Sequence, residues 1–354
     1  MKKLHKKGVY ISALTLLLVC CQVQKKNILE LFKIEKKLQH EKIEMKHNDY
    51  LFHAWCMYKT GNYLVINDDN GKTYMSIFDL KEQRYINHFI KKGAGPNEMF
   101  SPPQSITPLT NNQLSYFDAQ ARIIYQANYS KPDSIKITKI KNFTNTQTLF
   151  LGLIPMAYDY YVGIGLIESG RYAVIDKNGK NVSINFDYPK DEMKQGNNFQ
   201  KALAYQGGLI PNSDKTKFFF YCISSEILEI MQLQKNGTLT KIRDIHFDYA
   251  TYRPEGDGKN TIAATIMKES KAAFISATAT SNYIYLLYSG RTIGVDINLA
   301  FKSNTILVFD WEGNPIKRYN LDIDITTFTV SEDDKTIYAI SNTSVDTDLI
   351  KFKM

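Results

Sequence analysis

The sequence is poor in cysteine and tryptophan, and no apolar run after residue 21 is long enough to cross a membrane as a helix. Its 354 residues include four cysteines and two tryptophans. Four cysteines are too few for a disulfide-stapled scaffold, and a membrane-spanning helix needs about 20 consecutive apolar residues. Core-forming residues are abundant, because 44% of the chain is hydrophobic, with 23 tyrosines and 19 phenylalanines. We therefore expect a globular, strand-rich protein.

Positive charge is scarce once the N-terminus is set aside. The chain has 44 Lys and Arg against 36 Asp and Glu, but Lys2, Lys3, Lys6 and Lys7 lie at the very start. Without these four the balance is 40 against 36, or +4. No later segment concentrates basic residues with interleaved aromatics, so we expect no nucleic-acid partner. The densest charged stretch, Lys33 to His47, mixes both signs and is typical of a solvated face or a tether.

The N-terminus has the pattern of an export signal. The basic segment Lys2 to Lys7 precedes a largely apolar run, Val9 to Val19, which is too short to span a bilayer but suits a signal peptide. Leu18-Val19-Cys20-Cys21 then resembles a bacterial lipobox, in which a leucine stands three places before the lipidated cysteine. We predict a lipoprotein signal peptide over residues 1–20 and lipidation of Cys21. Cys20 is the less suitable acceptor, because bulky Val19 would stand at the cut. The alternative is an ordinary signal peptide cut elsewhere.

Acyl chains on Cys21 would hold the protein at a membrane surface rather than across it. The residues that follow, Gln22 to Asn27, are basic and rich in amides, whereas known tags for surface export are acidic at this point. We therefore expect a lipid-anchored protein of the cell envelope, on the outer membrane and facing the periplasm, with the cell surface as the alternative.

After residue 48 the sequence consists of short aromatic and β-branched runs separated by turn residues. The runs fall into six sets, which form a meander pattern. The first set is 51–58, 63–68, 74–80 and 84–90; the second 105–109, 113–118, 122–129 and 134–140; the third 148–154, 160–166, 171–176 and 181–188; the fourth 203–209, 217–223, 227–233 and 239–247; the fifth 274–279, 283–289, 305–310 and 316–321; the sixth 326–330, 336–341 and 349–353.

Residues 48–354 divided by six give about 51 residues per set, close to the length of a propeller blade. We predict an all-β, six-bladed β-propeller of four-stranded antiparallel blades over 48–354. The sixth set lacks one strand, and Ile28 to Ile34 is the expected donor that pairs with Leu349 to Lys353 and closes the ring. Residues 21–47 are thus a tether with a ring-closing strand. An amphipathic helix over Asn27 to His47 is the alternative.

Two stretches interrupt the rhythm of the strands. One is Lys190 to Gly208, with helical character around Phe199 to Tyr205, and the other is Thr251 to Ser276, which contains YRPEGDGKNTIAATIMKESKAAF. We interpret both as inserts that extend one face of the repeat architecture, where binding often occurs.

Several longer segments resemble a known family. These are FIKKGAGPNEMFSPPQSI from Phe89, LAYQGGLIPNSDKTKFFF from Leu203, IYLLYSGR from Ile284 and NTILVFDWEGNPIKRYNLDIDITTFTVSEDDKTIYAI from Asn304. They are similar to the TolB-like six-bladed β-propeller lipoproteins of Bacteroidetes, and the resemblance covers nearly the whole mature chain. It implies a propeller on a lipid anchor. It implies no established reaction, so no catalytic residue is carried over.

The sharpest family mark is the loop Gly93-Ala94-Gly95-Pro96-Asn97-Glu98, where the family typically has Gly-x-Gly-Pro-Gly-Glu. Asn97 replaces the third glycine, and asparagine also tolerates a positive φ. Backbone N–H groups of such a loop could bind an anion. The loop follows a strand but opens no helix, so we interpret Gly93, Gly95, Pro96 and Glu98 as structural, with Glu98 capping backbone groups or meeting a basic side chain.

No motif in the sequence defines a catalytic or metal site. Asp244, His246 and Asp248 alternate on one predicted strand face and could hold a metal, but solvent-facing polar residues are the commoner cause of such a pattern. The sequence has no Cys-x-x-Cys, His-x-x-x-His or Gly-x-Ser-x-Gly. We therefore predict no metal, no cofactor and no catalytic residue.

Cys56 and Cys222 lie in apolar runs and are expected to be small buried residues, and whether they pair is left open. Trp55 and Trp311 are interpreted as core or blade-edge aromatics rather than sugar platforms. The favoured function is a binding or scaffold module for an envelope protein, a peptide, a glycan or a small ligand. The alternative is a metal-dependent propeller hydrolase, lactonase or lyase.

Overall fold

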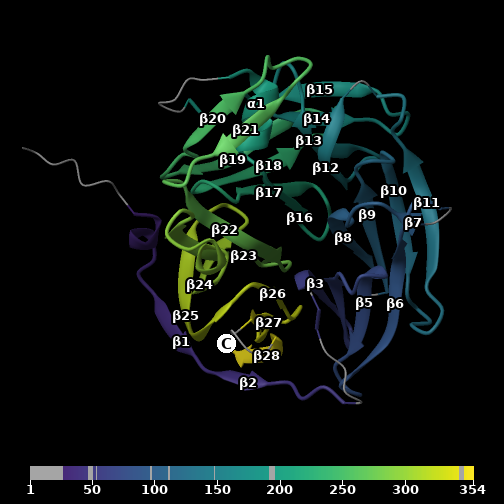
Figure 1. The fold of residues 1–354 in the computed structure, drawn as a ribbon, viewed down its shortest axis with the longest axis vertical. Coiled ribbons are helices and arrows are strands. Elements are labelled where there is room, and N and C mark those ends of the chain that lie inside the picture. Colours follow the sequence, from purple (N-terminus) through teal and green to yellow (C-terminus); the bar gives the residue numbers. More distant parts are fainter. Residues whose placement is uncertain are drawn as a thin grey trace, which may run out of the picture.

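The structure, a computed structural model, describes residues 27–46, 51–52, 54–95, 98–110, 112–146, 148–190, 196–342 and 347–354. Within them the chain forms six antiparallel sheets arranged as blades around a central axis (Figure 1). The predicted all-β six-bladed propeller is confirmed. The predicted signal peptide, Cys20, Cys21 and Pro96 lie outside the described residues.

Each blade takes its strands in chain order. Blade 1 has β3 (Ala54–Thr60), β4 (Tyr63–Asp68), β5 (Thr73–Asp79) and β6 (Arg84–Lys92), with β7 (Glu98–Met99) added at its outer edge; blade 2 has β8 (Gln104–Thr110), β9 (Gln113–Asp118), β10 (Ile123–Asn128) and β11 (Lys136–Asn142); blade 3 has β12 (Leu149–Pro155), β13 (Tyr161–Leu166), β14 (Tyr172–Ile175) and β15 (Asn181–Asn185).

The second half of the ring follows the same plan. Blade 4 has β16 (Gly207–Pro211), β17 (Lys217–Cys222), β18 (Ile227–Leu233) and β19 (Leu239–His246); blade 5 has β22 (Lys271–Ala279), β23 (Tyr283–Thr292), β24 (Ser303–Asp310) and β25 (Pro315–Ile325); blade 6 has β26 (Thr327–Val330), β27 (Thr336–Asn342) and β28 (Thr347–Lys353).

The middle strands of the blades are buried on both faces, which explains their continuous apolar runs. Leu64 to Asp68 in β4 and Tyr74 to Phe78 in β5 are all buried, whereas the outer strand β11 is mostly exposed. Tight turns join the strands, and Gly61 between β3 and β4 has a φ of +53°, which favours glycine. The apolar side chains of neighbouring blades pack against each other and form the core between them.

The N-terminal segment closes the ring, but with a different part from the one predicted. β2 (His40–Lys42) pairs antiparallel with β28 and completes blade 6, while β1 (Glu35–Leu38) runs parallel to β25 on blade 5. The predicted donor strand at Ile28 to Ile34 is wrong, because Ile28–Leu31 forms a 3-10 helix, η1, with Asn27 as its N-cap. Ile28 and Phe32 are buried in the core of blades 4 and 5, and that burial holds the segment in place.

The first strands of the blades surround the axis, since β3, β26, β22, β16, β12 and β8 contact one another in that ring order. They begin at one face of the ring, named here the insert face, and end at the other, the opposite face. Both predicted inserts lie on the insert face. The first contains α1 (Asn198–Ala204), as its helical character predicted, and the second contains the hairpin of β20 (Tyr252–Glu255) and β21 (Ala263–Ile266).

The first strand of blade 4 begins later than predicted, at Gly207. The capping box of Asn197 and Gln200 starts α1, which extends to Ala204 and therefore includes Leu203. A short helix, α2 (Ile297–Ala300), lies in the connection from β23 to β24. Among the described residues, none of the helices is both long and apolar enough to traverse a bilayer.

Candidate functional site

The two inserts join each other above blade 4 and form part of a pocket. Gln200 Nε2 donates to the Glu255 carbonyl at 3.0 Å, and Asn197 Nδ2 donates to the Gly258 carbonyl at 2.7 Å. Tyr205, which follows α1, lies edge-on to Tyr252 of the hairpin with ring centroids 5.9 Å apart. These contacts fix α1 over the entrance to the space between blades 3 and 4.

The pocket beneath α1, named here the insert pocket, has a volume of about 340 Å³. It opens at the end of the ring where the first strands begin, because Gln104 and Gly207 are the first residues of β8 and β16. Its lining is Ser101, Gln104, Ala119, Leu151, Ile164, Gly165, Arg171, Tyr188, Ala202, Tyr205, Gln206, Gly207, Phe220 and Ile223. Arg171 is the only residue of this lining that carries a formal charge.

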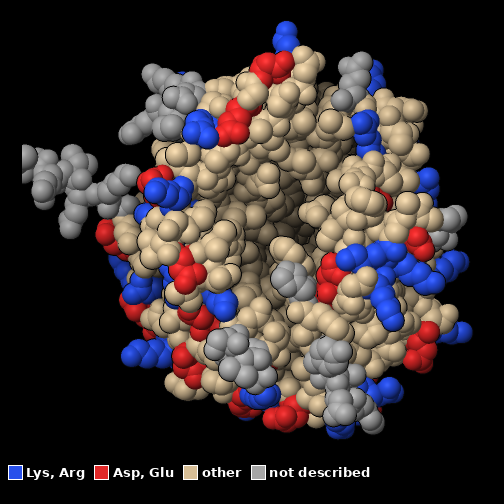
Figure 2. Space-filling view, in the orientation of Figure 1, with Lys and Arg blue, Asp and Glu red and all other residues tan. Residues whose placement is uncertain are grey.

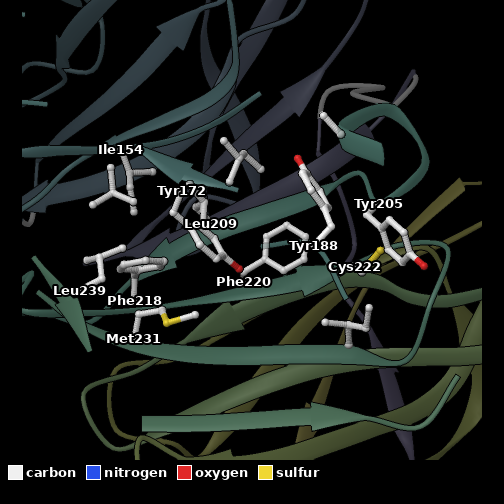
Figure 3. Close-up of a cluster of buried hydrophobic side chains, with 14 of the residues drawn as sticks. Ile154, Tyr172, Tyr188, Tyr205, Leu209, Phe218, Phe220, Cys222, Met231 and Leu239 are labelled. Atoms are coloured by element: carbon white, nitrogen blue, oxygen red, sulfur yellow. The ribbon is translucent and has the colours of Figure 1, made fainter. Parts of the chain in front are cut away.

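Aromatic rings surround the guanidinium of Arg171. Its central carbon lies 4.2 Å from the ring centroid of Phe220 and 5.4 Å from that of Tyr188. Tyr188 in turn lies 6.2 Å from Tyr205, centroid to centroid. Figure 3 shows Tyr188, Phe220 and Tyr205 at one side of the buried apolar cluster. Burial raises the pKa of the Tyr188 hydroxyl to about 12, so this side chain is a neutral hydrogen-bonding group.

Arg171 forms an ion pair with a carboxylate of the next blade. It stands just before β14 in blade 3, and its Nη1 donates to Glu229 Oε2 of β18 in blade 4 at 2.5 Å. Both side chains are only 1% exposed. The hydroxyl of Tyr172 donates to the same carboxylate oxygen. Arg171 Nη2 has no hydrogen-bond acceptor among the described residues, although the atom is buried.

The other oxygen of Glu229 contacts side chains of β19, the outer strand of blade 4. Lys241 Nζ of β19 lies 3.0 Å from Glu229 Oε1 and 2.7 Å from Asp244 Oδ2. His246 Nε2 contacts Asp244 and lies 3.7 Å from Glu229 Oε1. Burial by itself raises the pKa of the Glu229 carboxyl. The charge of Arg171, the nearby imidazole of His246, the charge of Lys241 and the hydrogen bond from Tyr172 outweigh burial and hold that pKa well below its usual range.

Glu229, Asp244 and His246 are also the residues whose donor atoms could ligate a metal ion, since one atom from each lies within 4.8 Å of the others. Two of them belong to the alternating Asp244, His246 and Asp248 of the sequence, whereas Asp248 pairs with Lys271 at 3.1 Å. The same Glu229 carboxylate already carries Arg171 and Lys241, and two positive side chains oppose a bound cation. This charge balance favours an ion-pair network, and the absence of a metal stays a prediction.

The family loop after β6 is held by its own glutamate. Gly95 N–H donates to Glu98 Oε2 at 3.0 Å, and Glu98 N–H donates to the Gly95 carbonyl at 3.1 Å. Gly93 has a φ of +150°, and a Cβ at this position would lie 2.0 Å from Glu98 Oε2. The Glu98 carboxylate thus occupies the space beside Gly93 and Gly95 that an anion would need, and the structural role of these residues stays a prediction.

Among the described residues, the cysteines and tryptophans singled out in the sequence do not line the insert pocket. Cys56 and Cys222 are both free thiols, and burial raises the pKa of Cys56 to about 11, so Cys56 is not an activated nucleophile. Cys222 belongs to the apolar cluster behind Phe220. Trp311 is buried, and its indole N–H donates to the Thr280 carbonyl, whereas Trp55 at the start of β3 is 59% exposed. Trp311 is thus a core aromatic and Trp55 a surface one.

The opposite face has a hollow of its own around the axis, with a volume of about 270 Å³. Its walls come from the last residues of the first strands, including Thr60, Pro211, Ala279 and Val330. Most of the polar groups there are hydroxyls, and its two charged residues, Lys59 and Glu332, pair with each other at 3.3 Å. The insert face, which is the one seen in Figure 2, carries Lys, Arg, Asp and Glu mostly around its rim, while its central depression is lined by other residues.

Six four-stranded blades around one axis define a six-bladed β-propeller. Residues 32–333 match the model of the TolB-like 6-blade propeller-like family, and the chain belongs to this family. No curated protein matches the chain.

Two solved structures show the same fold at low sequence identity. One is a Bacteroides fragilis protein named as exported, with 12% identity, 90% of this chain and 98% of that chain covered, and a TM-score of 0.54. The other is a member of the DUF4221 family from Bacteroides vulgatus, with 11% identity, 90% and 96% coverage, and a TM-score of 0.54. At these identities the likeness shows the fold alone.

Proposed function

We propose that this protein is a lipid-anchored binding module of the cell envelope, and that it binds its partner or ligand at the insert face. The observation that carries the proposal is the insert pocket, which combines a volume of about 340 Å³ with a fully buried arginine and three aromatic rings. A concave, largely apolar pocket with a few placed polar groups is typical of a ligand site. The family match and the similarity to a protein named as exported support an envelope location.

Exposed apolar side chains also favour the insert face. Trp55, Phe100, Leu149 and Leu151 stand at or just before the start of first strands. The connection from β23 to β24 returns to the same face, because β23 runs antiparallel to β22, and it exposes Val295, with 85% of its surface accessible. Exposed apolar groups gathered on one face are typical of interaction surfaces. Among the described residues, the large apolar ones exposed at the opposite face include Tyr158 and Val182, which stands near the start of β15.

A capture experiment with matched variants tests the choice of face. The full chain, purified in detergent and immobilised, is incubated with an extract of the envelope. Leu151→Asp alters the insert face, and Tyr158→Asp is the control on the opposite face. We expect wild type and Tyr158→Asp to retain the same protein or glycan, and Leu151→Asp to lose it. Equal capture by all three, or no specific capture by wild type, would count against the proposal.

The alternative function is a metal-dependent hydrolase, lactonase or lyase, and the specific observation in its favour is the cluster of Glu229, Asp244 and His246. A metal analysis of the purified protein separates the two. One tightly held divalent ion per chain, lost in Asp244→Asn, would favour the enzyme. A folded protein without a stoichiometric ion would favour the binding module.

A further inference from the structure

The insert pocket has a chemical character that narrows the class of its ligand. Its polar groups other than Arg171 are uncharged: the hydroxyls of Ser101, Tyr188 and Tyr205 and the amides of Gln104 and Gln206. Gln104 and Gln206 are exposed, and Leu151 beside them is 37% exposed, so these three residues lie where a ligand would enter. Tyr188 and Tyr205 are buried and form the deeper wall.

The deepest polar group is an incompletely bonded guanidinium. Arg171 is 1% exposed, Nη1 is bonded to Glu229, and Nη2 is buried without an acceptor among the described residues. A buried donor that lacks an acceptor destabilises the protein, because its hydration is lost and not replaced. Arg171 lines the pocket, so a ligand oxygen that accepts a hydrogen bond from Nη2 would supply the missing acceptor.

The charge of Arg171 is already balanced. Glu229 is its ion-pair partner, and Lys241, which shares Glu229, is balanced in turn by Asp244. A carboxylate or phosphate entering the pocket would approach Glu229 as well as Arg171, without an unpaired cation to receive it. The pocket therefore offers hydrogen-bond donors and aromatic walls to a ligand whose acceptor oxygens are uncharged.

We propose that the insert pocket binds a neutral saccharide unit. A pyranose ring has apolar C–H faces for Leu151, Ile164 and the tyrosine rings, and hydroxyls for the two glutamines and Arg171 Nη2. This inference rests on the proposed binding function and specifies the ligand for the same site. The pocket should bind neutral sugars more tightly than uronic acids, which have the same ring but carry a carboxylate.

The test uses the full chain in a detergent without a sugar headgroup. The probes are D-glucose and D-galactose, free and as their β-linked disaccharides, each matched with D-glucuronate or D-galacturonate. Binding is detected by saturation-transfer NMR and measured by calorimetry. We expect the neutral sugars to bind and each uronate to bind at least about tenfold more weakly.

Two variants on one strand locate the binding. Leu149 and Leu151 both lie in β12 and are 43% and 37% exposed, but only Leu151 lines the insert pocket. Leu151→Trp fills the entrance and should abolish binding, whereas Leu149→Trp should leave the affinity within about twofold of wild type. Arg171→Lys keeps the positive charge beside Glu229 but removes Nη2, and we expect it to weaken neutral sugars about tenfold or more.

Three outcomes would overturn the inference. These are tighter binding of the uronates than of the neutral sugars, no transfer to any sugar from folded wild-type protein, and equal binding by Leu149→Trp and Leu151→Trp. The last outcome would place the sugar elsewhere. The proposed binding function has a separate test, since capture from an envelope extract that is lost in Leu151→Asp would stand even if no sugar bound.

Discussion

Arg171 and Glu229 belong to adjacent blades and form an ion pair with 2.5 Å between Nη1 and Oε2, in a place where both side chains are 1% exposed. Removing one partner of a buried pair leaves an uncompensated charge, which typically costs about 3–5 kcal/mol. We expect Glu229→Gln to lower the free energy of unfolding by this amount, measured by urea denaturation. Arg253 and Glu255 form an exposed pair, so Arg253→Ala should change the same quantity by less than about 1 kcal/mol. Similar losses in both variants would contradict the importance of burial.

The same carboxylate makes stability depend on pH. The pKa of Glu229 in the folded protein is held below its ordinary value of 4.5. At a pH between these two pKa values, the unfolded chain therefore binds a proton that the folded protein does not. The stabilisation is complete above the unfolded pKa and is lost as the pH falls below about 4.5 toward the folded pKa. Denaturation curves from pH 7 to pH 3 should therefore show a steeper loss for wild type than for Glu229→Gln. If the stability of wild type and of Glu229→Gln falls in parallel with pH, this explanation is wrong.

Phe32 fixes the N-terminal segment to the ring. Its ring lies edge-on to Phe309 of blade 5, with centroids 5.1 Å apart, and the side chain is buried. We expect Phe32→Ala to destabilise the protein by about 3–5 kcal/mol. Ile34, two residues on, is 54% exposed, and Ile34→Ala should cost less than about 0.5 kcal/mol. Thermal and urea unfolding of the two variants provide the comparison, and an unaffected Phe32→Ala protein would show that the segment is not anchored there.

The family loop gives a test based on glycine. Gly93→Ala would introduce a Cβ 2.0 Å from Glu98 Oε2 at a φ of +150°, while Gly61→Ala has the positive φ of +53° but no atom within 4 Å of its Cβ. Gly61→Ala should therefore cost about 1 kcal/mol, and Gly93→Ala more, about 1–3 kcal/mol. If the two losses measured by urea unfolding are the same, the contact with Glu98 does not constrain the loop.

Lipidation of Cys21 is tested by labelling cells with a radioactive fatty acid. We expect incorporation to be lost in Cys21→Ser and retained in Cys20→Ser, and the Cys21→Ser protein to leave the membrane fraction, because acyl chains supply the attachment. Loss of label in Cys20→Ser alone would move the acceptor by one residue. Absence of label in wild type would remove the anchor from the proposal.

Local sequence patterns are sufficient to predict most strands of the blades. Tyr63 to Asp68 was predicted as a strand and is β4 with the same bounds, because turn residues on both sides and an apolar run between them act locally. The closing strand was placed wrongly for the same reason. All three residues of β2 are exposed, so they show no alternation. Ile28 to Ile34 alternates in part, but it forms a 3-10 turn and an extended segment in which Ile28 and Phe32 are the buried residues.

The insert pocket depends on contacts between blades, which no local pattern encodes. Arg171 and Glu229 are separated by 58 residues, and their partnership follows only from the packing of blades 3 and 4. One signal was present in the sequence. Glu229 lies inside the apolar run Ile227 to Leu233, and a carboxylate within a strand buried on both faces requires a partner. That signal indicates a buried cation nearby but does not identify which one.

The pairing of His40–Lys42 with Ile350–Phe352 has a consequence for how the protein folds. The four antiparallel strands of each of blades 1 to 5 are near one another in sequence, so each set can form before the ring closes. Blade 6 is different, since it needs residues from both extremes of the described chain. Until β2 pairs with β28, the ring is therefore an open arc with two unpaired edges.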